Sequence, residues 1–353
     1  MDTPQAALAG TTSRRSILAA AVTTALTGSL GHSVEAQAQV PGDLLASWND
    51  GAAKQAILDF VKATTDQASK DFVAPGDRIA TFDQDGTLWV EHPLYSQAMF
   101  ALDRVHALAP QHPEWKAKEP FKSVLANDMT AMGRFSERDW AEIVFVTHAG
   151  MSQTAFLETV TQWLATATHP RFKRPYTDLV YQPMIELLAY LRANRFETFI
   201  VTGGGQDFVR AYSQRVYGIP TQKVIGSSIA TKYEYKAGKA ELIRQPKLFF
   251  NDNNEGKAIG IDLFIGKCPY AAFGNSTGDR EMLEWAGTGD GARLKMLVYH
   301  DDAEREYAYG PAGGLPDTRV GTFTPGLMGE AKSRSWTVIS MKNDWRRVFA
   351  FET

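Results

Sequence analysis

The sequence predicts an α/β protein in which a mostly parallel sheet, covered by helices on both faces, carries an all-helical insertion. After Pro183, short apolar runs alternate with segments of helical periodicity, the pattern of parallel strands joined by helical crossovers. Between residues 91 and 182, several helical segments follow one another without a clear strand. We therefore expect a Rossmann-like core formed by residues 39–91 and 183–353, and a helical cap formed by residues 92–182.

The core is expected to begin with an amphipathic helix over residues 44–70 and a first strand over residues 78–82. Gly218 and Pro220 mark the end of a later helix. The remaining strands are expected at 196–201, 270–273, 295–299 and 336–341, the helices at 184–193, 206–217, 255–264 and 279–285, and a hairpin from 227 that turns at 236–239.

Four helices are expected in the cap, at residues 95–108, 121–132, 138–146 and 154–166. Ser136 and Asp139 have the spacing of a capping box at the start of the third. His92 and His148 are candidates for substrate contacts, although packing or capping is the commoner role of such histidines. The same holds for the cap aromatics, which more often pack helices than line a pocket: Tyr95, Trp115, Trp140 and Trp163.

Two aspartates follow the first predicted strand. Asp83 and Asp85 stand two residues apart in the segment DQDGT, so in an extended chain their carboxylates face the same way. Such a pair can divide the work of phosphoryl transfer, one acid serving as ionised nucleophile and the other as proton donor. The alternative is a calcium loop, which needs twelve oxygen-rich residues closed by Glu. The residues after Thr87 are apolar and Glu91 comes too early, so the catalytic interpretation is preferred.

A hydroxyl and three glycines follow the strand predicted at 196–201. Thr202 and Gly203, at the start of this segment, offer a side-chain donor and backbone N–H groups to an anion near a helix start. Taken alone the glycines equally suit a loose turn, and they do not have the spacing of a dinucleotide-binding loop. Lys257, at a later helix start, is the candidate cation for phosphoryl oxygens, with Lys247 and Lys267 as alternatives.

A polar loop, FGNSTGD, ends the strand predicted at residues 270–273. Its Asp279, together with Asp83 and the backbone carbonyl of Asp85, offers the hard oxygen ligands that Mg²⁺ prefers. Asp279 also suits the N-cap of the helix that follows, and the two roles are compatible.

In this order, the four motifs resemble those of the haloacid dehalogenase (HAD) superfamily, over nearly the whole chain after residue 38. The resemblance implies that Asp83 is a nucleophile forming an aspartyl-phosphate and that Asp85 is the general acid and base. It also implies that Thr202 and Gly203 bind the substrate phosphate and that Lys257 balances its charge. Asn275 and Asp279 match the acidic positions of the fourth motif, so the implied Mg²⁺ site consists of Asp83, Asp85, Asn275 and Asp279.

The cap looks like that of phosphoserine-phosphatase-like members of this superfamily. Because Asp85 is present, phosphoryl transfer is expected rather than dehalogenation, and the implied activity is Mg²⁺-dependent hydrolysis of a small phosphomonoester. Asn275 departs from the family pattern, since its amide oxygen can bind Mg²⁺ but carries no charge. Metal affinity is then lower, or Asp279 carries more of the coordination.

Three other functions are compatible with parts of the sequence. The chain can pass the phosphoryl group to an alcohol or sugar, or bind a phosphorylated ligand without turnover. The third is a serine hydrolase, because residues 274–278 match G-x-S-x-G around Ser276. The only histidine after Ser276 is His300, which is too close in sequence to leave room for the intervening strands of that fold.

The N-terminal residues predict export to the periplasm or medium. Arg14 and Arg15 form a twin-arginine signature, followed by a weakly apolar stretch and the small-x-small site AQA at 36–38, so residues 1–38 are expected to be removed. The single cysteine, Cys268, allows no internal disulfide and is expected to be a buried small hydrophobe. A net charge of −3 gives no reason to expect nucleic acid or a membrane surface as partner, and the oligomeric state is not predicted.

Overall fold

The computed structural model describes residues 45–313 and 320–352, which belong to one compact unit. The predicted signal segment, residues 1–38, lies outside the described residues. No helix within the described ranges combines the length and apolar character needed to cross a membrane.

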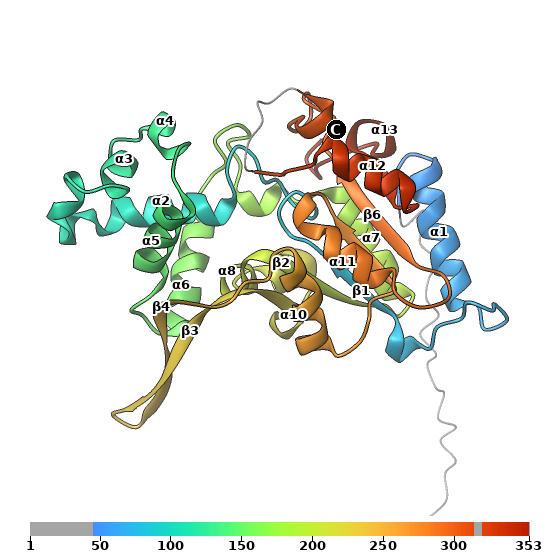
Figure 1. The fold of residues 1–353 in the computed structure, drawn as a ribbon, viewed down its shortest axis with the longest axis horizontal. Helices are drawn as coiled ribbons and strands as arrows, with labels where there is room; N and C mark the ends of the chain where they lie inside the picture. Colours follow the sequence, from blue (N-terminus) through green and yellow to red (C-terminus); the bar gives the residue numbers. More distant parts are fainter. Residues whose placement is uncertain (1–44, 314–319, 353) are drawn as a thin grey trace, which may run out of the picture. The chain divides into compact units, whose positions relative to one another are not determined.

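The described chain is built around a seven-stranded sheet with the order β4-β3-β2-β1-β5-β6-β7 (Figure 1). Every pair of neighbouring strands is parallel except β3 and β4, which form an antiparallel hairpin. The mostly parallel sheet is therefore confirmed. The strands are β1 Ile79–Phe82, β2 Glu197–Gly205, β3 Val224–Lys236, β4 Lys239–Phe250, β5 Ala271–Gly274, β6 Leu294–Tyr299 and β7 Thr337–Ser340.

Helices cover both faces of this sheet, as predicted. Successive residues of a strand point to opposite faces, and accordingly Ile200 and Phe273 join one buried cluster while Val201 and Ala272 join another. The first cluster includes residues of α1 (Ala52–Thr65), α7 (Gln182–Ala193), α8 (Gln206–Arg210), α9 (Ser213–Tyr217) and α13 (Met341–Asp344). The second includes residues of α10 (Glu255–Ile265), α11 (Arg280–Ala286) and α12 (Pro325–Ser333).

Five α-helices lie between β1 and α7 in the chain: α2 (Ser96–Leu108), α3 (Phe121–Leu125), α4 (Met129–Met132), α5 (Glu137–His148) and α6 (Gln153–Leu164). The helix predicted at 121–132 is broken, because Asn127 adopts a left-handed φ of 53° and Asp128 caps α4. The capping box of Ser136 and Asp139 is confirmed. Trp115 is buried in a separate cluster of these helices.

Further differences from the sequence predictions are local, beginning with the helix predicted over residues 44–70, which spans only Ala52–Thr65. The helix predicted at 206–217 is divided into α8 and α9, and it ends at Gly218 in the left-handed conformation that such a stop requires. The strand predicted to end at residue 201 continues as β2 to Gly205. Cys268 is half-buried rather than fully buried, and its thiol donates to the backbone oxygen of Trp285 at 2.8 Å.

Candidate active site

The carboxyl ends of β1, β2 and β5 lie side by side. The register pairs Phe82 with Ile200 of β2 and with Phe273 of β5, and the N–H of Asp83 donates to the carbonyl of Phe273 at 2.8 Å. Asp83, the first residue after β1, therefore emerges at the edge of the sheet where parallel α/β folds bind their ligands.

Lys257 links Asp83 to Asp279. Its Nζ donates to Oδ1 of Asp83 at 2.6 Å, to Oδ1 of Asp279 at 2.5 Å and to the backbone oxygen of Val201 at 3.1 Å. The Lys257 side chain is 2% exposed and that of Asp279 is fully buried. Three residues predicted for the site, from the end of β1, the first turn of α10 and the loop after β5, thus form one buried ion-pair group. The alternative cation Lys267 pairs instead with Asp77 on the exposed surface.

Burial perturbs the titration of these groups. Burial and the charge of Asp279 together raise the pKa of Asp83 to about 7, against the opposing effect of Lys257. Burial also raises the pKa of Asp85 to about 6, against the hydrogen bond that Trp89 Nε1 donates to its Oδ1 at 2.8 Å. Burial lowers the pKa of Lys257, but the carboxylates of Asp279 and Asp83 outweigh it and the net pKa is raised. A carboxyl with a pKa near 6 suits general acid and base chemistry near neutral pH.

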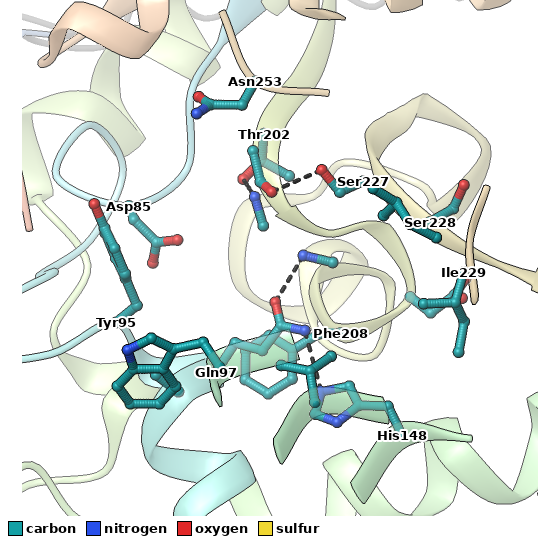
Figure 2. A pocket seen from close by; sticks show the side chains of 18 of the residues that line it. Asp85, Tyr95, Gln97, His148, Thr202, Phe208, Ser227, Ser228, Ile229 and Asn253 are labelled. Carbon is teal, nitrogen blue, oxygen red and sulfur yellow. Dashed lines mark hydrogen bonds between the residues drawn. The ribbon is translucent and has the colours of Figure 1, made fainter. Parts of the chain in front are cut away.

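Thr202 and its glycines border the same space. Thr202 is buried, and its Oγ1 accepts from the N–H of Gly204 at 3.0 Å. A Cβ on Gly204 would lie 3.2 Å from that hydroxyl and 3.7 Å from Oδ2 of Asp85, so a side chain there would crowd the site. The hydroxyl of Ser227 in β3 donates a hydrogen bond to the carbonyl oxygen of Gly203 at 2.8 Å (Figure 2). The segment is therefore a hydrogen-bonded continuation of β2, not a loose turn.

Asp279 and Asn275 organise the loop after β5. Oδ2 of Asp279 accepts from the N–H groups of Asn275 and Ser276, both at 3.0 Å, and from the hydroxyl of Ser276 at 3.2 Å. Asp279 stands at the N-cap position of α11, as predicted, but its side chain closes this turn and makes no cap bond to that helix. His300 bonds to Glu306 and to the backbone oxygen of Gly86 instead of to Ser276, which removes the partner that a serine hydrolase needs.

The donors at this edge fit a hard divalent cation. Within residues 45–313 and 320–352, no group of three or more His, Cys, Asp or Glu side chains could hold a metal ion. The predicted Mg²⁺ donors are a different set, in which two carboxylates (Asp83 and Asp279) are joined by the amide oxygen of Asn275 and the backbone carbonyl of Asp85. Burial raises the pKa values of Asp83 and Asp85, so their ionised forms are costly unless a further cation stabilises them. Carboxylate, amide and carbonyl oxygens are the hard ligands that Mg²⁺ prefers.

Sequence reasoning missed two buried acids beside the predicted residues. Glu91 is 2% exposed, and its Oε1 accepts from Nδ2 of Asn275 at 2.7 Å and from the hydroxyl of Tyr309. Asp252 is fully buried, and neither of its carboxylate oxygens has a hydrogen-bond partner among the residues that the structure describes. Burial raises the pKa of Asp252 to about 8, against the opposing charge of Lys257. No local sequence pattern distinguishes these acids, because their burial comes from distant segments.

A third missed residue, Gln97 of α2, connects the cap to the glycine segment. Its Oε1 accepts from the N–H of Gly205 at 2.6 Å, and its Nε2 lies 3.1 Å from Nε2 of His148 in α5 (Figure 2). Because the Gly205 donor fixes the amide orientation, Gln97 donates to His148, which therefore carries its proton on Nδ1. Burial and the charge of Arg244 lower the pKa of His148 to about 3, in agreement with a neutral ring.

A cavity of about 490 Å³ lies over these groups. Asp83, Asp85, Thr202 and Lys257 line one end of it. Residues of α2, α5, α6, α8 and the β3–β4 hairpin line the remainder. In Figure 2, Asp85, Tyr95 and Thr202 border the same open space, with Gln97 and His148 on another side of it. Cap and core residues therefore enclose one site.

Comparison with known proteins agrees with this arrangement. The family model of the haloacid dehalogenase-like hydrolases matches residues 80–284. A conserved functionally unknown protein from Anaerococcus prevotii DSM 20548 is 14% identical, with a TM-score of 0.53 over 85% of this chain and 97% of that one. A protein of unknown function from Bordetella pertussis Tohama I is 20% identical, with a TM-score of 0.44 over 74% of this chain and 97% of that one. Comparison with curated protein sequences gives no match.

Proposed function

The chain belongs to the haloacid dehalogenase-like hydrolase family, and we propose that it is an exported, Mg²⁺-dependent phosphatase that hydrolyses a small phosphomonoester. The observation that carries this proposal is the buried bridge in which Lys257 holds Asp83 and Asp279, at the end of a cavity that Asp85 and Thr202 also line. A nucleophile, a proton donor and a fixed cation are the parts that phosphoryl transfer from a carboxylate needs.

In the proposed mechanism, a carboxylate oxygen of Asp83 attacks phosphorus and forms an aspartyl-phosphate as the bond to the leaving oxygen breaks. Asp85 gives its proton to that oxygen, while Lys257 and Thr202 stabilise charge on the phosphoryl oxygens. Asp85 then takes a proton from water, which attacks phosphorus, releases inorganic phosphate and restores Asp83. When bound, Mg²⁺ supplies further positive charge there, held by Asp83, the carbonyl of Asp85, Asn275 and Asp279.

Transfer to an alcohol or sugar, and phosphate-ligand binding without turnover, use the same residues and are the alternatives. Export favours hydrolysis, because release of phosphate outside the cytoplasm needs water alone. The export hypothesis itself rests on the sequence around Arg14 and Arg15. Replacing both by Lys is expected to leave the full-length protein inside the cells, where a blot of fractionated cells would detect it.

The test of function is a panel of phosphomonoesters assayed with the wild type and with Asp83→Asn in parallel. We expect Mg²⁺-dependent release of phosphate that chelation abolishes. We also expect Asp83→Asn to lose turnover while its circular dichroism stays that of the wild type. Turnover that persists in Asp83→Asn would remove this residue as nucleophile. Binding without phosphate release by the wild type would favour the non-catalytic alternative.

A further inference from the structure

The apolar residues that line the cavity indicate which class of leaving group it binds. We propose that the preferred substrate is a phosphomonoester whose leaving group is uncharged and apolar, with a flat aromatic group as the best match. This inference rests on the proposed phosphatase activity and adds the substrate class to it.

The first support is an apolar wall of the cavity that lies outside the buried hydrophobic clusters. Val144 and Phe145 of α5, and Ile229 and Leu248 of the β3–β4 hairpin, line the cavity. In the described part of the chain, none of the four belongs to any of the three buried hydrophobic clusters. Their side chains therefore present apolar surface that a ligand can remove from water.

The second support is that the cation of this wall already has an anionic partner. Arg244 is 4% exposed, forms an ion pair with Asp207, and stacks over the ring of Phe156 with its guanidinium 3.9 Å from the ring centroid. Its Nε also donates to the backbone oxygen of His148 at 2.7 Å. A carboxylate or second phosphate on the leaving group would share Arg244 with Asp207 and face the charge of that aspartate, which is unfavourable in a buried site.

The third support is that Gln97 and His148, two polar residues of the cap wall, are already paired. Gln97 uses its oxygen on Gly205 and its amide on His148, and Nδ1 of His148 lies 2.7 Å from the hydroxyl of Thr147. The side chains of Gln97 and His148 are therefore hydrogen-bonded to protein groups, and the apolar residues of the wall remain to contact the leaving group. The phosphate end and this apolar wall belong to the same cavity, whose 490 Å³ lies within the size range of sites for drug-sized ligands.

Two matched substrate pairs test the proposal with the wild-type protein. 2-Naphthyl and phenyl phosphate have leaving groups of similar acidity but different apolar area, and we expect kcat/KM to be about tenfold higher for the naphthyl ester. The 4-carboxamide and 4-carboxylate of phenyl phosphate are close in shape but differ in charge. We expect the carboxylate to lower kcat/KM by about tenfold or more relative to the amide.

Variants of the apolar wall test whether its side chains cause the preference for the naphthyl ester. Phe145→Ala is expected to reduce the naphthyl-to-phenyl ratio toward one, and Phe145→Leu to give an intermediate ratio. The control is Phe249→Ala, which removes a 75% exposed phenylalanine of β4 that does not line the cavity, and which should keep the wild-type ratio. If Phe145→Ala fails to fold, Ile229→Ala provides the same measurement.

Calorimetry with Asp83→Asn measures binding of the same esters without turnover, and the naphthyl ester should bind about tenfold more tightly than the phenyl ester. Hydrolysis with equal kcat/KM within the naphthyl and phenyl pair, or with preference for the carboxylate, would overturn this inference and leave the phosphatase proposal standing. If the protein binds the naphthyl ester more tightly but hydrolyses no ester, the phosphatase proposal is overturned and the inference about the leaving group stands.

Discussion

Asn275 donates a hydrogen bond from Nδ2 to Oε1 of Glu91 at 2.7 Å, and both side chains are buried. Asn275 occupies a position where the resemblance to the family suggested an acid. The neighbouring carboxyl gives a physical reason for an amide there, because a second carboxylate would place two acceptors in contact. The carboxyl group that Asn275 lacks is therefore present on its hydrogen-bond partner Glu91, whose pKa burial raises well above its ordinary value.

Asn275→Asp is thus expected to destabilise the protein instead of improving the site. It replaces a donor by an acceptor 2.7 Å from Glu91, and the expected loss is about 1–3 kcal/mol in the free energy of unfolding, measured by urea denaturation. The double change Glu91→Gln with Asn275→Asp restores a donor to the pair and should recover part of that loss. Additive effects of the two changes would contradict this explanation.

Lys257→Met should be strongly destabilising and inactive. It leaves the carboxylates of Asp83 and Asp279 buried without their cation, and breaking such a group costs about 3–5 kcal/mol of unfolding free energy. Lys267→Met is the matched control, since its ion pair with Asp77 is half exposed on both sides and should be worth less than about 1 kcal/mol. Equal losses of unfolding free energy in the two variants would show that the buried ion pairs stabilise the protein no more than the exposed one.

His148 should contribute a loss of stability in acid. Its pKa lies near 3 in the folded chain but near 6.5 in an unfolded one, so below pH 6.5 the unfolded state takes up the proton first. Between pH 6.5 and 3 the unfolding free energy should therefore fall by up to about 1.4 kcal/mol per pH unit from this residue. His148→Gln should remove that slope, which urea titrations at several pH values would measure. If the unfolding free energies of the wild type and His148→Gln change in parallel with pH, the contribution of His148 is contradicted.

Asp252 should act in the opposite direction. Its pKa near 8 in the folded protein exceeds the value of 3.8 of an exposed aspartate, so stability is lost as pH rises between these values. Asp252→Asn has nearly the same shape and no titration, and its unfolding free energy relative to wild type should increase from pH 4 to pH 8 and then level off. A difference that does not vary with pH would mean that Asp252 is ionised without cost.

The sequence predicted the parts of the site that depend on local order. A carboxylate pair directly after an apolar strand, and a polar loop after another strand, must meet at the same edge of a parallel sheet, as Asp83 and Asp279 do. The prediction of Lys257 as the cation also depended on its place in the order of the motifs. Glu91, Gln97 and Asp252 could not be found in this way, because no motif marks them and they are brought to the site by the packing of distant segments.

The same distinction applies to the fold. Strands and helices with clear periodicity were predicted, whereas the break at Asn127 depends on one left-handed residue inside a helical pattern. The helix α12 begins with Pro325 and Gly326, which obscure its periodicity. The extension of β2 to Gly205 is set by pairing with β3, a tertiary contact that no glycine-rich segment reveals by itself.

The β3–β4 hairpin has a mechanical consequence for access to the cavity. Arg244 of β4 exchanges main-chain hydrogen bonds with the segment that joins α5 to α6: its N–H donates to Met151, and its carbonyl accepts from Gly150, both at 2.9 Å. The helices α5 and α6 are therefore joined to β4 through their connecting segment. Any displacement of that segment away from the hairpin would break these two hydrogen bonds, unless β4 moved with it.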